Sequence, residues 1–269
     1  MSASTRFWRD PAMPHVESRR ACHSRACYKA HSHPTFSIGA IDQGRSRFSG
    51  AGSVAVPLQA GTLVFVPAER VHACNPDPDT AWSYQMLHLD AAWLRGVRQE
   101  YLQDEASSGE PVRILSDKAL YTDFCRLNTV LFSQAEVADK EAALIEFIGD
   151  SDRISGLSID ASASVRQSGR LDAVLALLRR EPAVARSLDE LADAAGMSRY
   201  RLLRAFRART GMTPHAWQVN QRINVARDLL QGGQALAQVA LHLGFADQAH
   251  FQRAFKAHTG VTPGLYRCR

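Results

Sequence analysis

The sequence lacks any long apolar run. No stretch of its 269 residues approaches the roughly 18 apolar residues that suggest a membrane-spanning helix, and residues 1–15 contain no apolar core of signal-peptide length. Cysteine is scarce as well, with five residues at scattered spacing and no paired C-x-x-C motif. These absences argue against a membrane partner and against a disulfide framework. We expect a cytoplasmic protein.

Motifs of common catalytic sites are also missing. The chain shows no Ser-His-Asp arrangement, no phosphate-binding loop and no paired carboxylates. Hydrophobic residues make up 45% of the chain, which is enough to bury a core and excludes wholesale disorder. The sequence therefore predicts a folded protein that is not an enzyme.

Charge is unevenly distributed along the chain. Residues 1–169 carry 17 basic and 20 acidic side chains, whereas residues 170–269 carry 15 basic and 7 acidic ones. A basic carboxyl-terminal third attached to a slightly acidic remainder is typical of a polyanion-binding module joined to a neutral partner domain. A solvated basic face would give the same charge count, so the motifs in this third must decide between the two interpretations.

Residue patterns divide the chain into a β-rich part and a helical part. Short apolar runs broken by Gly, Pro and Asp predict strands within residues 28–90, in a sandwich or barrel. Apolar residues at helical spacing predict helices over residues 117–148, which either pack on the core or form a dimer face. We predict a two-domain α+β protein with a β-barrel and following helices at 1–149, a polar linker at 150–169 and an all-helical domain at 170–269.

The helical part contains an internal repeat. Residues 198–214 align with residues 247–263 at an offset of 49, with eight of 17 positions identical. Each copy predicts a helix, a short turn and a second helix. In the first copy Ser187 and Glu190 predict a capping box, and Gly196 suits the left-handed turn that ends the first helix. The repeat therefore predicts two helix-turn-helix units.

The second helix of each unit has an apolar and a polar face. Leu202 and Phe206 in the first copy, like Phe251 and Phe255 in the second, lie at i, i+4 and should be buried. On the polar face, Arg and Gln suit guanine and adenine edges, and Lys and Arg also neutralise phosphates. The predicted DNA-binding residues are Arg199, Tyr200, Leu203, Arg204, Arg207, Gln248, Ala249, His250, Gln252, Arg253 and Lys256.

A single helix is predicted between the two units, from Pro214 to about Leu230. At 1.5 Å per residue it is about 25 Å long. A rigid spacer of that order can hold two recognition helices about one DNA turn apart, in adjacent major grooves. Double-stranded DNA with a specific sequence is therefore the predicted partner of this domain.

Three stretches of the helical part are distinctive: SLDELADAAGMSRYRLLRAFRARTGMTP, RINVARDLL and VALHLGFADQAHFQRAFKAHTGVTPGLYR. Residues 184–269, which contain them, resemble the DNA-binding domain of the AraC/XylS family of bacterial transcription regulators. The resemblance implies a regulator that touches RNA polymerase, usually as an activator. It assigns base reading to Tyr200, Leu203, Arg204, Gln248, Ala249, His250 and Arg253.

Two shorter patterns lie in the β-rich part. One is His31-Ser-His33, and the other consists of Gly61, Pro67 and His72. Their spacings resemble the two cupin motifs. Many AraC-family regulators have a cupin-like domain as effector sensor, often followed by a helical dimerisation segment. The resemblance implies a small-molecule effector and a homodimer.

Three interpretations of His31, His33 and His72 compete. Three imidazoles with an open position make a plausible divalent-metal site, but metal-binding cupins have a glutamate in the first motif where this chain has Ser37 and Ile38. The histidines otherwise bind a polar or anionic effector, or are structural at the barrel mouth. We predict effector binding, with no metal and no other cofactor. With the residues that alternate along one predicted strand, the predicted effector-binding set is His31, His33, His72, Tyr84, Met86 and His88.

The favoured function is a DNA-binding transcription regulator that responds to a small molecule bound in its amino-terminal barrel. Two other functions are weighed against it. A cupin metalloenzyme fused to a DNA-binding domain would need a bound metal, and the missing glutamate weighs against it. A ligand-independent DNA-binding protein would use the barrel only to dimerise.

Overall fold

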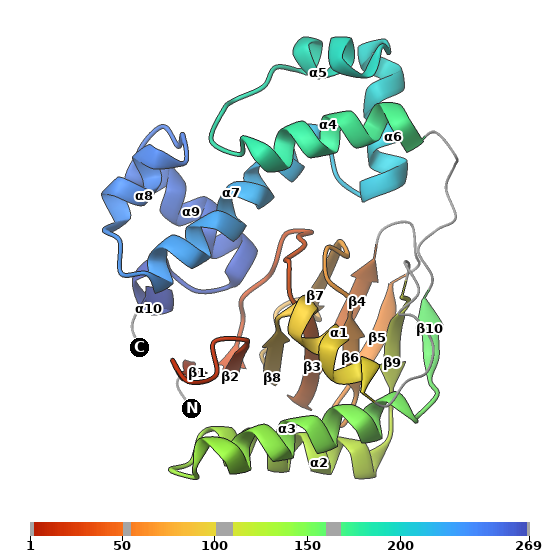
Figure 1. Ribbon diagram of the computed structural model, residues 1–269, viewed down its shortest axis with the longest axis vertical. Coiled ribbons are helices and arrows are strands. Elements are labelled where there is room, and N and C mark those ends of the chain that lie inside the picture. Colours follow the sequence, from red (N-terminus) through yellow and green to blue (C-terminus); the bar gives the residue numbers. More distant parts are fainter. Residues whose placement is uncertain (1–2, 51–54, 101–109, 160–167, 268–269) are drawn as a thin grey trace.

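The computed structural model describes residues 3–50, 55–100, 110–159 and 168–267 (Figure 1). The first three ranges form a β-rich domain with three helices, and the last forms an all-helical domain, as predicted. Within these ranges no helix combines the length and apolarity needed to cross a bilayer. The strands are β1 (Ser4–Arg9), β2 (Val16–Ser24), β3 (Phe36–Gln43), β4 (Arg45–Gly50), β5 (Val56–Gln59), β6 (Leu63–Val66), β7 (His72–Pro76), β8 (Trp82–Leu89), β9 (Val112–Leu115) and β10 (Leu157–Ile159).

The strands form two sheets that face each other. The larger has the order β1-β2-β8-β3-β6-β9-β10, and the smaller has the order β5-β4-β7. Phe48 and Leu58 of the small sheet share one buried cluster with Val64 and Val66 of the large one. The prediction of strands within residues 28–90 is confirmed, with β3 to β8 in that range. The prediction missed β1 and β2, because buried positions on both faces of β2, such as Ser18 and Arg19, are polar and break the apolar alternation.

Three helices complete the first domain: α1 (Ala91–Gln99), α2 (Lys118–Leu131) and α3 (Val137–Asp152). In Figure 1, α2 and α3 lie side by side along the barrel. Leu120, Phe124 and Leu127 pack with Phe36 and Leu87 of the large sheet in one core cluster. The apolar stripe predicted between residues 117 and 148 is therefore core packing, which leaves it no free apolar face for a dimer.

Strand β8 explains how the first domain acquires a polar interior. Its residues alternate between the two faces of the large sheet. Leu87 and Leu89 pack in the helix-covered core, whereas Trp82 and Tyr84 point toward the small sheet. His88 is on the same face as Tyr84, as the sequence alternation predicted.

The predicted linker at 150–169 begins inside α3 and then forms β10, which pairs with β9 at the edge of the large sheet. Residues 160–167 lie outside the described ranges. The chain resumes in the helical domain, whose elements are α4 (Ser168–Arg180), α5 (Leu188–Ala195), α6 (Arg199–Thr210), α7 (Pro214–Gln231), α8 (Leu236–His242), α9 (Gln248–Thr259) and α10 (Pro263–Arg267).

Both helix-turn-helix units are present, at α5–α6 and α8–α9, with α7 between them. The capping box of Ser187 and Glu190 is formed, and Gly196 has the left-handed conformation at the end of α5. Asp247 caps α9 through the amide of His250. The predicted buried positions Leu202, Phe206, Phe251 and Phe255 are all fully buried.

Candidate functional site

The polar faces of α6 and α9 are open to solvent. Nine of the eleven predicted DNA-binding residues are exposed, and Leu203 and Gln252 are half-buried. Tyr200 is 67% exposed, and its hydroxyl accepts a 3.4 Å hydrogen bond from Arg204. Arg199 pairs with Asp189 of α5 at 3.3 Å in an exposed ion pair. These side chains are therefore free to meet another molecule without disturbing the core.

A buried arginine holds the two units together. Arg222 of α7 is 7% exposed and donates to the carbonyl oxygens of Pro182 and Ala183, at 2.8 and 3.2 Å, and of Gly244, at 2.9 Å. Pro182 and Ala183 precede α5, whereas Gly244 lies in the turn between α8 and α9. Gly244 has a φ of +69°, and a Cβ there would lie 2.5 Å from the Ala183 oxygen. The contact fixes one unit relative to the other.

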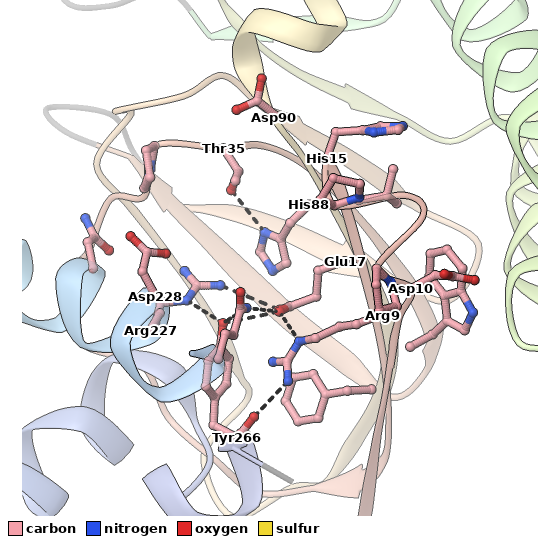
Figure 2. A pocket seen from close by; sticks show the side chains of 18 of the residues that line it. Arg9, Asp10, His15, Glu17, Thr35, His88, Asp90, Arg227, Asp228 and Tyr266 are labelled. Atoms are coloured by element: carbon pink, nitrogen blue, oxygen red, sulfur yellow. Dashed lines mark hydrogen bonds and ion pairs between the residues drawn. The ribbon is translucent and has the colours of Figure 1, made fainter. Parts of the chain in front are cut away.

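A cavity of about 660 Å³ lies between the two domains (Figure 2). The first domain contributes residues of β1 and β2 and the loop between them, and the second contributes residues of α7 and α10. The walls mix aromatic, acidic and basic side chains. They include Phe7, Trp8, Arg9, Asp10, Glu17, His88, Asp228 and Tyr266.

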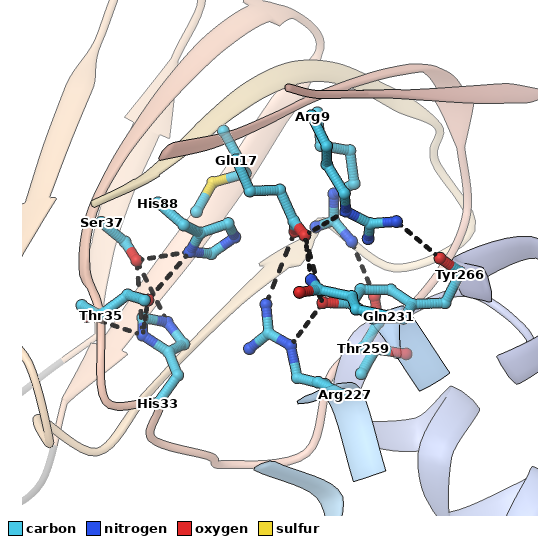
Figure 3. A network of polar contacts seen from close by, with 12 residues as sticks. Arg9, Glu17, His33, Thr35, Ser37, His88, Arg227, Gln231, Thr259 and Tyr266 are labelled. Atoms are coloured by element: carbon cyan, nitrogen blue, oxygen red, sulfur yellow. Dashed lines mark hydrogen bonds and ion pairs between the residues drawn. The ribbon is translucent and has the colours of Figure 1, made fainter. Parts of the chain in front are cut away.

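A network centred on Glu17 crosses the domain boundary at this cavity (Figure 3). The Glu17 carboxylate is 11% exposed and accepts hydrogen bonds from Arg9 at 2.7 Å, Gln231 at 2.9 Å and Tyr266 at 3.2 Å. Arg227 of α7 lies 3.7 Å from it and donates to the Tyr266 hydroxyl at 3.2 Å. One carboxylate of β2 therefore holds α7 and α10 against the first domain.

Further bonds attach the end of α9 and the middle of α7. Arg19 of β2 donates to the carbonyl oxygen of Thr259 at 2.8 Å, and the amide of Lys29 donates to Ala257 at 2.9 Å. Asn220 donates to the Ser32 carbonyl oxygen at 3.0 Å. The acceptor in each of these bonds is a backbone carbonyl oxygen of the other domain. The bonds can therefore form only while the two domains are docked.

The structure brings all six predicted effector-binding residues around a second, smaller cavity of about 60 Å³ at the open end of the barrel, where Arg227, His258 and Tyr266 of the helical domain also line it. One ring nitrogen from each of His31, His33 and His72 lies within 4.8 Å of the others. The rings of His31 and His72 have centroids 4.6 Å apart, and His33 lies 5.1 Å from His88. Glu17, His88, Arg227 and Tyr266 line both cavities, so they form the wall between them.

The environment keeps these imidazoles neutral. Burial lowers the pKa of His33 well below its usual value, and the positive charge that His72 would carry adds to the effect. Burial likewise lowers the pKa of His88 and His72, and the nearby Arg227 disfavours a charged His88 further. At neutral pH each ring therefore carries one proton and one free lone pair.

Sequence reasoning missed the domain-crossing network, although one signal for it exists in α7. Asn220, Asn224, Arg227 and Gln231 recur at three- and four-residue intervals, which places them on one side of the helix. A second polar stripe beside the apolar one indicates a helix that packs against a polar partner. Glu17 and Arg19 gave no such signal, because their partners lie more than 200 residues away in the sequence.

Two protein-family models match the chain. Residues 14–148 match the AraC-like ligand binding domain, which is half of the chain, and residues 191–269 match a helix-turn-helix domain. The two matches coincide with the barrel and the paired helical units.

Individual proteins resemble the chain either over most of its length or over a part of it. The HTH-type transcriptional regulator YbfI of Bacillus subtilis is 23% identical over 245 residues, which cover 90% of this chain and 87% of that protein. The regulator MtrA of Neisseria gonorrhoeae is 38% identical over 82 residues, covering 30% of this chain and 27% of MtrA. The structure of Vibrio cholerae ToxT with an unsaturated fatty acid bound superimposes with a TM-score of 0.59 at 14% identity, covering 99% of this chain and 95% of ToxT.

Proposed function

The chain belongs to the AraC family of transcription regulators, and we propose that a small organic effector changes its DNA binding from the cavity between its two domains. The chain has an AraC-like ligand-binding domain and a DNA-binding helix-turn-helix domain. In this proposal the β-rich domain senses the effector and the helical domain, from α4 onward, binds DNA.

The size and position of the larger cavity carry the proposal. Its volume of about 660 Å³ falls in the range of about 300–1,000 Å³ that is usual for small-molecule sites. A molecule there touches β1 and β2 on one side and α7 and α10 on the other. Its affinity must therefore differ between the docked and the separated arrangement of the domains, which is what an effector needs in order to shift an equilibrium.

The predicted effector-binding residue that faces this cavity is His88. The other five lie behind it around the small cavity, whose 60 Å³ are well below the size of a small-molecule site. We propose that the effector lies among the aromatic rings of Phe7, Trp8 and Tyr266 and reaches His88 with a polar group. The fatty acid bound by ToxT, which shares this fold, is an example of a ligand with an apolar body and a polar end.

We further propose that Tyr200, Leu203 and Arg204 of α6, with Gln248, Ala249, His250 and Arg253 of α9, read base edges. Arg199, Arg207, Gln252 and Lys256 would contact phosphates. Arg204→Ala and Arg253→Ala should each weaken binding to the preferred DNA sequence by about 1–3 kcal/mol. Their effect on random DNA should be smaller, and an equal loss on both would make them phosphate contacts. Gel-shift titration at a fixed salt concentration measures both.

Family membership supports the remaining proposals. We propose that the protein acts in the cytoplasm as a homodimer and activates transcription by touching RNA polymerase. Because the apolar sides of α2 and α3 are covered by the core, any dimer contact must use other surfaces. Analytical ultracentrifugation with and without DNA tests the dimer, and in vitro transcription tests the activation.

The test of the effector proposal begins with selection of bound sequences from random DNA by the full chain. The selected DNA then serves in a thermal-shift and gel-shift screen of small organic molecules. A compound that raises the melting temperature and changes DNA affinity supports the proposal. Asp228→Trp, an exposed residue at the cavity on α7, should abolish that response by filling the space.

Asp139→Trp is the matched control, because Asp139 is exposed on α3, on the helix-covered side of the barrel. It should leave the response to the compound unchanged. If Asp228→Trp keeps the full response while the protein remains folded, the effector binds elsewhere. If a broad screen finds no stabilising compound, the ligand-independent DNA-binding function is favoured instead.

A further inference from the structure

The small cavity at the open end of the barrel carries a surplus of positive charge. The guanidinium groups of Arg19 and Arg227 line it, and Glu17 supplies the carboxylate of its lining. Arginine keeps its proton even when it is buried, so this charge is permanent. Its effect reaches the imidazoles: burial lowers the pKa of His88, and the charges of Arg227 and Arg19 lower it further. The cavity is therefore electrostatically suited to an anion.

Glu17 does not neutralise Arg19, because other partners already occupy its two oxygens. The Oε2 atom accepts hydrogen bonds from three side chains, namely Arg9, Gln231 and Tyr266 (Figure 3). The Oε1 atom lies 3.7 Å from Arg227. Two of the three arginines around Glu17 thus share its single charge, and the charge of Arg19 is left over.

Within the described ranges, Arg19 forms hydrogen bonds with neutral groups alone. It is 8% exposed and donates to the Thr259 carbonyl oxygen at 2.8 Å and to the Tyr28 hydroxyl at 3.2 Å. Its Nε is also buried and has no hydrogen-bond partner there. The rings of Phe7, Tyr28 and Tyr84 lie 5.3–5.9 Å from the guanidinium carbon and attract its charge, but they bring no negative charge. A buried charged donor without an acceptor is costly, so an acceptor is expected at this atom.

A second donor lies beside Arg19. The hydroxyl groups of Tyr28 and Tyr84 are hydrogen-bonded to each other, and both tyrosines line the cavity. Burial raises the pKa of Tyr84 well above its usual value, so this hydroxyl keeps its proton. A hydrogen bond between two phenols uses one proton and leaves the other free to donate. The lining therefore offers one charged and one neutral donor to the same ligand.

We propose that a planar oxyanion of carboxylate size binds in the small cavity and accepts hydrogen bonds from Arg19 Nε and from this pair of phenols. A space of about 60 Å³ holds a few water molecules, and therefore one such group but no organic body. Arginine suits this ligand because the planar guanidinium matches the geometry of a carboxylate. The anion is either free, such as formate, or the acidic end of an effector that occupies the larger cavity. The second case rests on the proposed function, and the first does not.

Anion binding is measured on the full chain by replacing sodium chloride with ¹³C-labelled sodium formate at constant ionic strength. The ¹³C NMR signal should show saturable binding of one formate per chain. Arg19→Gln should weaken it about 10- to 100-fold, the effect of losing one charge-assisted hydrogen bond. Arg20→Gln is the matched control, because Arg20 is next to Arg19 on the opposite face of β2 and bonds to Thr129. It should bind formate as the unaltered chain does.

Absence of saturable binding to the folded full chain would overturn the proposal, and so would equal affinity in Arg19→Gln and the unaltered chain. If Arg19→Gln does not fold, the unaltered chain with ¹⁵N-labelled arginine decides. One Nε–H resonance should then shift with the same dissociation constant as formate. If none shifts, no arginine binds the anion and the proposal fails.

A longer carboxylate, 4-phenylbutanoate, distinguishes the two sources of the anion. If the site takes the acidic end of the effector, this compound should bind more tightly than formate, and Asp228→Trp should remove the gain. If the site takes a free anion, formate should bind at least as tightly as the longer compound. Formate binding is measured without effector or DNA, so its failure would leave the proposed function untouched.

Discussion

The two helix-turn-helix units share a fold and much of their sequence, yet they contact the sensor domain very differently. The second unit and the spacer before it are tied to the barrel by the buried carboxylate of Glu17, by Arg19 and by the backbone of Lys29. The first unit and the helix α4 before it meet the barrel through Val71, which packs in their shared apolar core, and through the ion pair of Arg179 on α4 with Glu69. That ion pair is about half exposed and spans 3.6 Å.

This difference suggests that DNA binding and the response to an effector depend on different parts of the helical domain. Both units present an exposed polar helix face, so both can meet DNA. Among the described residues of the helical domain, those that line the interdomain cavity and share its buried polar network lie on α7 and α10, on either side of the second unit. A ligand that alters this cavity therefore acts first on α7, α9 and α10. The first unit follows through Arg222, which connects the two units.

The largest expected effect is at that connection. Arg222→Met removes three hydrogen bonds from a charged, buried donor and leaves three backbone oxygens without their partner. We expect a loss of about 3–5 kcal/mol in the free energy of unfolding of the helical domain. Urea unfolding followed by circular dichroism measures it. Arg222→Lys, which retains the charge but fewer donors, should lose less.

The matched control for this change is Arg201→Met, at an exposed position of α6. It should alter stability by no more than about 0.5 kcal/mol. Equal effects of the two substitutions would mean that the two units do not depend on Arg222 for their relative position.

The next effect concerns the docking of the second unit. Glu17→Gln removes the charge that Arg9 and Arg227 share and leaves two guanidinium groups at the domain boundary without a carboxylate. We expect docking to weaken by about 2 kcal/mol, or about 30-fold. The amide of Lys29, bonded to Ala257 across the boundary, reports this as faster hydrogen–deuterium exchange.

Buried amides of β3 serve as the internal reference in that experiment, because they report unfolding of the barrel rather than separation of the domains. Their exchange should not change in Glu17→Gln. If hydrogen–deuterium exchange becomes faster in β3 as well as at Lys29, the substitution has unfolded the barrel. If neither changes, Glu17 does not hold the domains together.

The same comparison shows what the sequence contains and what it lacks. The repeat, its caps and its buried positions are local features, so Leu202, Phe206, Phe251 and Phe255 could be predicted from helical spacing alone. The six residues around the small cavity followed from strand alternation and short motifs. The partners of Glu17 and Arg19 could not be predicted, because the local sequence around a polar residue does not indicate which distant residue it contacts. The interdomain cavity was missed for the same reason.

Acid should affect the barrel through its histidines. Because burial lowers the pKa of His33 and His72 in the folded protein, the unfolded chain binds more protons as the pH falls below about 6.5. Stability is therefore full above that pH and is lost as the pH falls toward the folded-state pKa values. Each group contributes at most about 1.4 kcal/mol per pH unit. We therefore expect the free energy of unfolding to fall as the pH is lowered from 6.5 to 5.5.

Denaturant unfolding at four pH values in the presence of EDTA measures this slope. His33→Gln should remove part of it, whereas the exposed His215→Gln on α7 should not. A stability that does not change over this range would show that the cluster accepts protons without cost.

The smallest effect is expected at the first unit. Glu69→Gln makes the same chemical change as Glu17→Gln, but the Glu69 side chain is 40% exposed and, among the residues that the structure describes, forms an ion pair with Arg179 alone, at 3.6 Å. Solvent-exposed ion pairs contribute about 0–1 kcal/mol, so the free energy of docking measured by exchange at Lys29, and the free energy of unfolding, should stay within about 0.5 kcal/mol of the unaltered chain. The backbone bond from Glu69 to His33 is retained in the variant. If Glu69→Gln separates the domains as Glu17→Gln does, then both units are held by charge at the barrel, and an effector would act on the two recognition helices together rather than on the second one first.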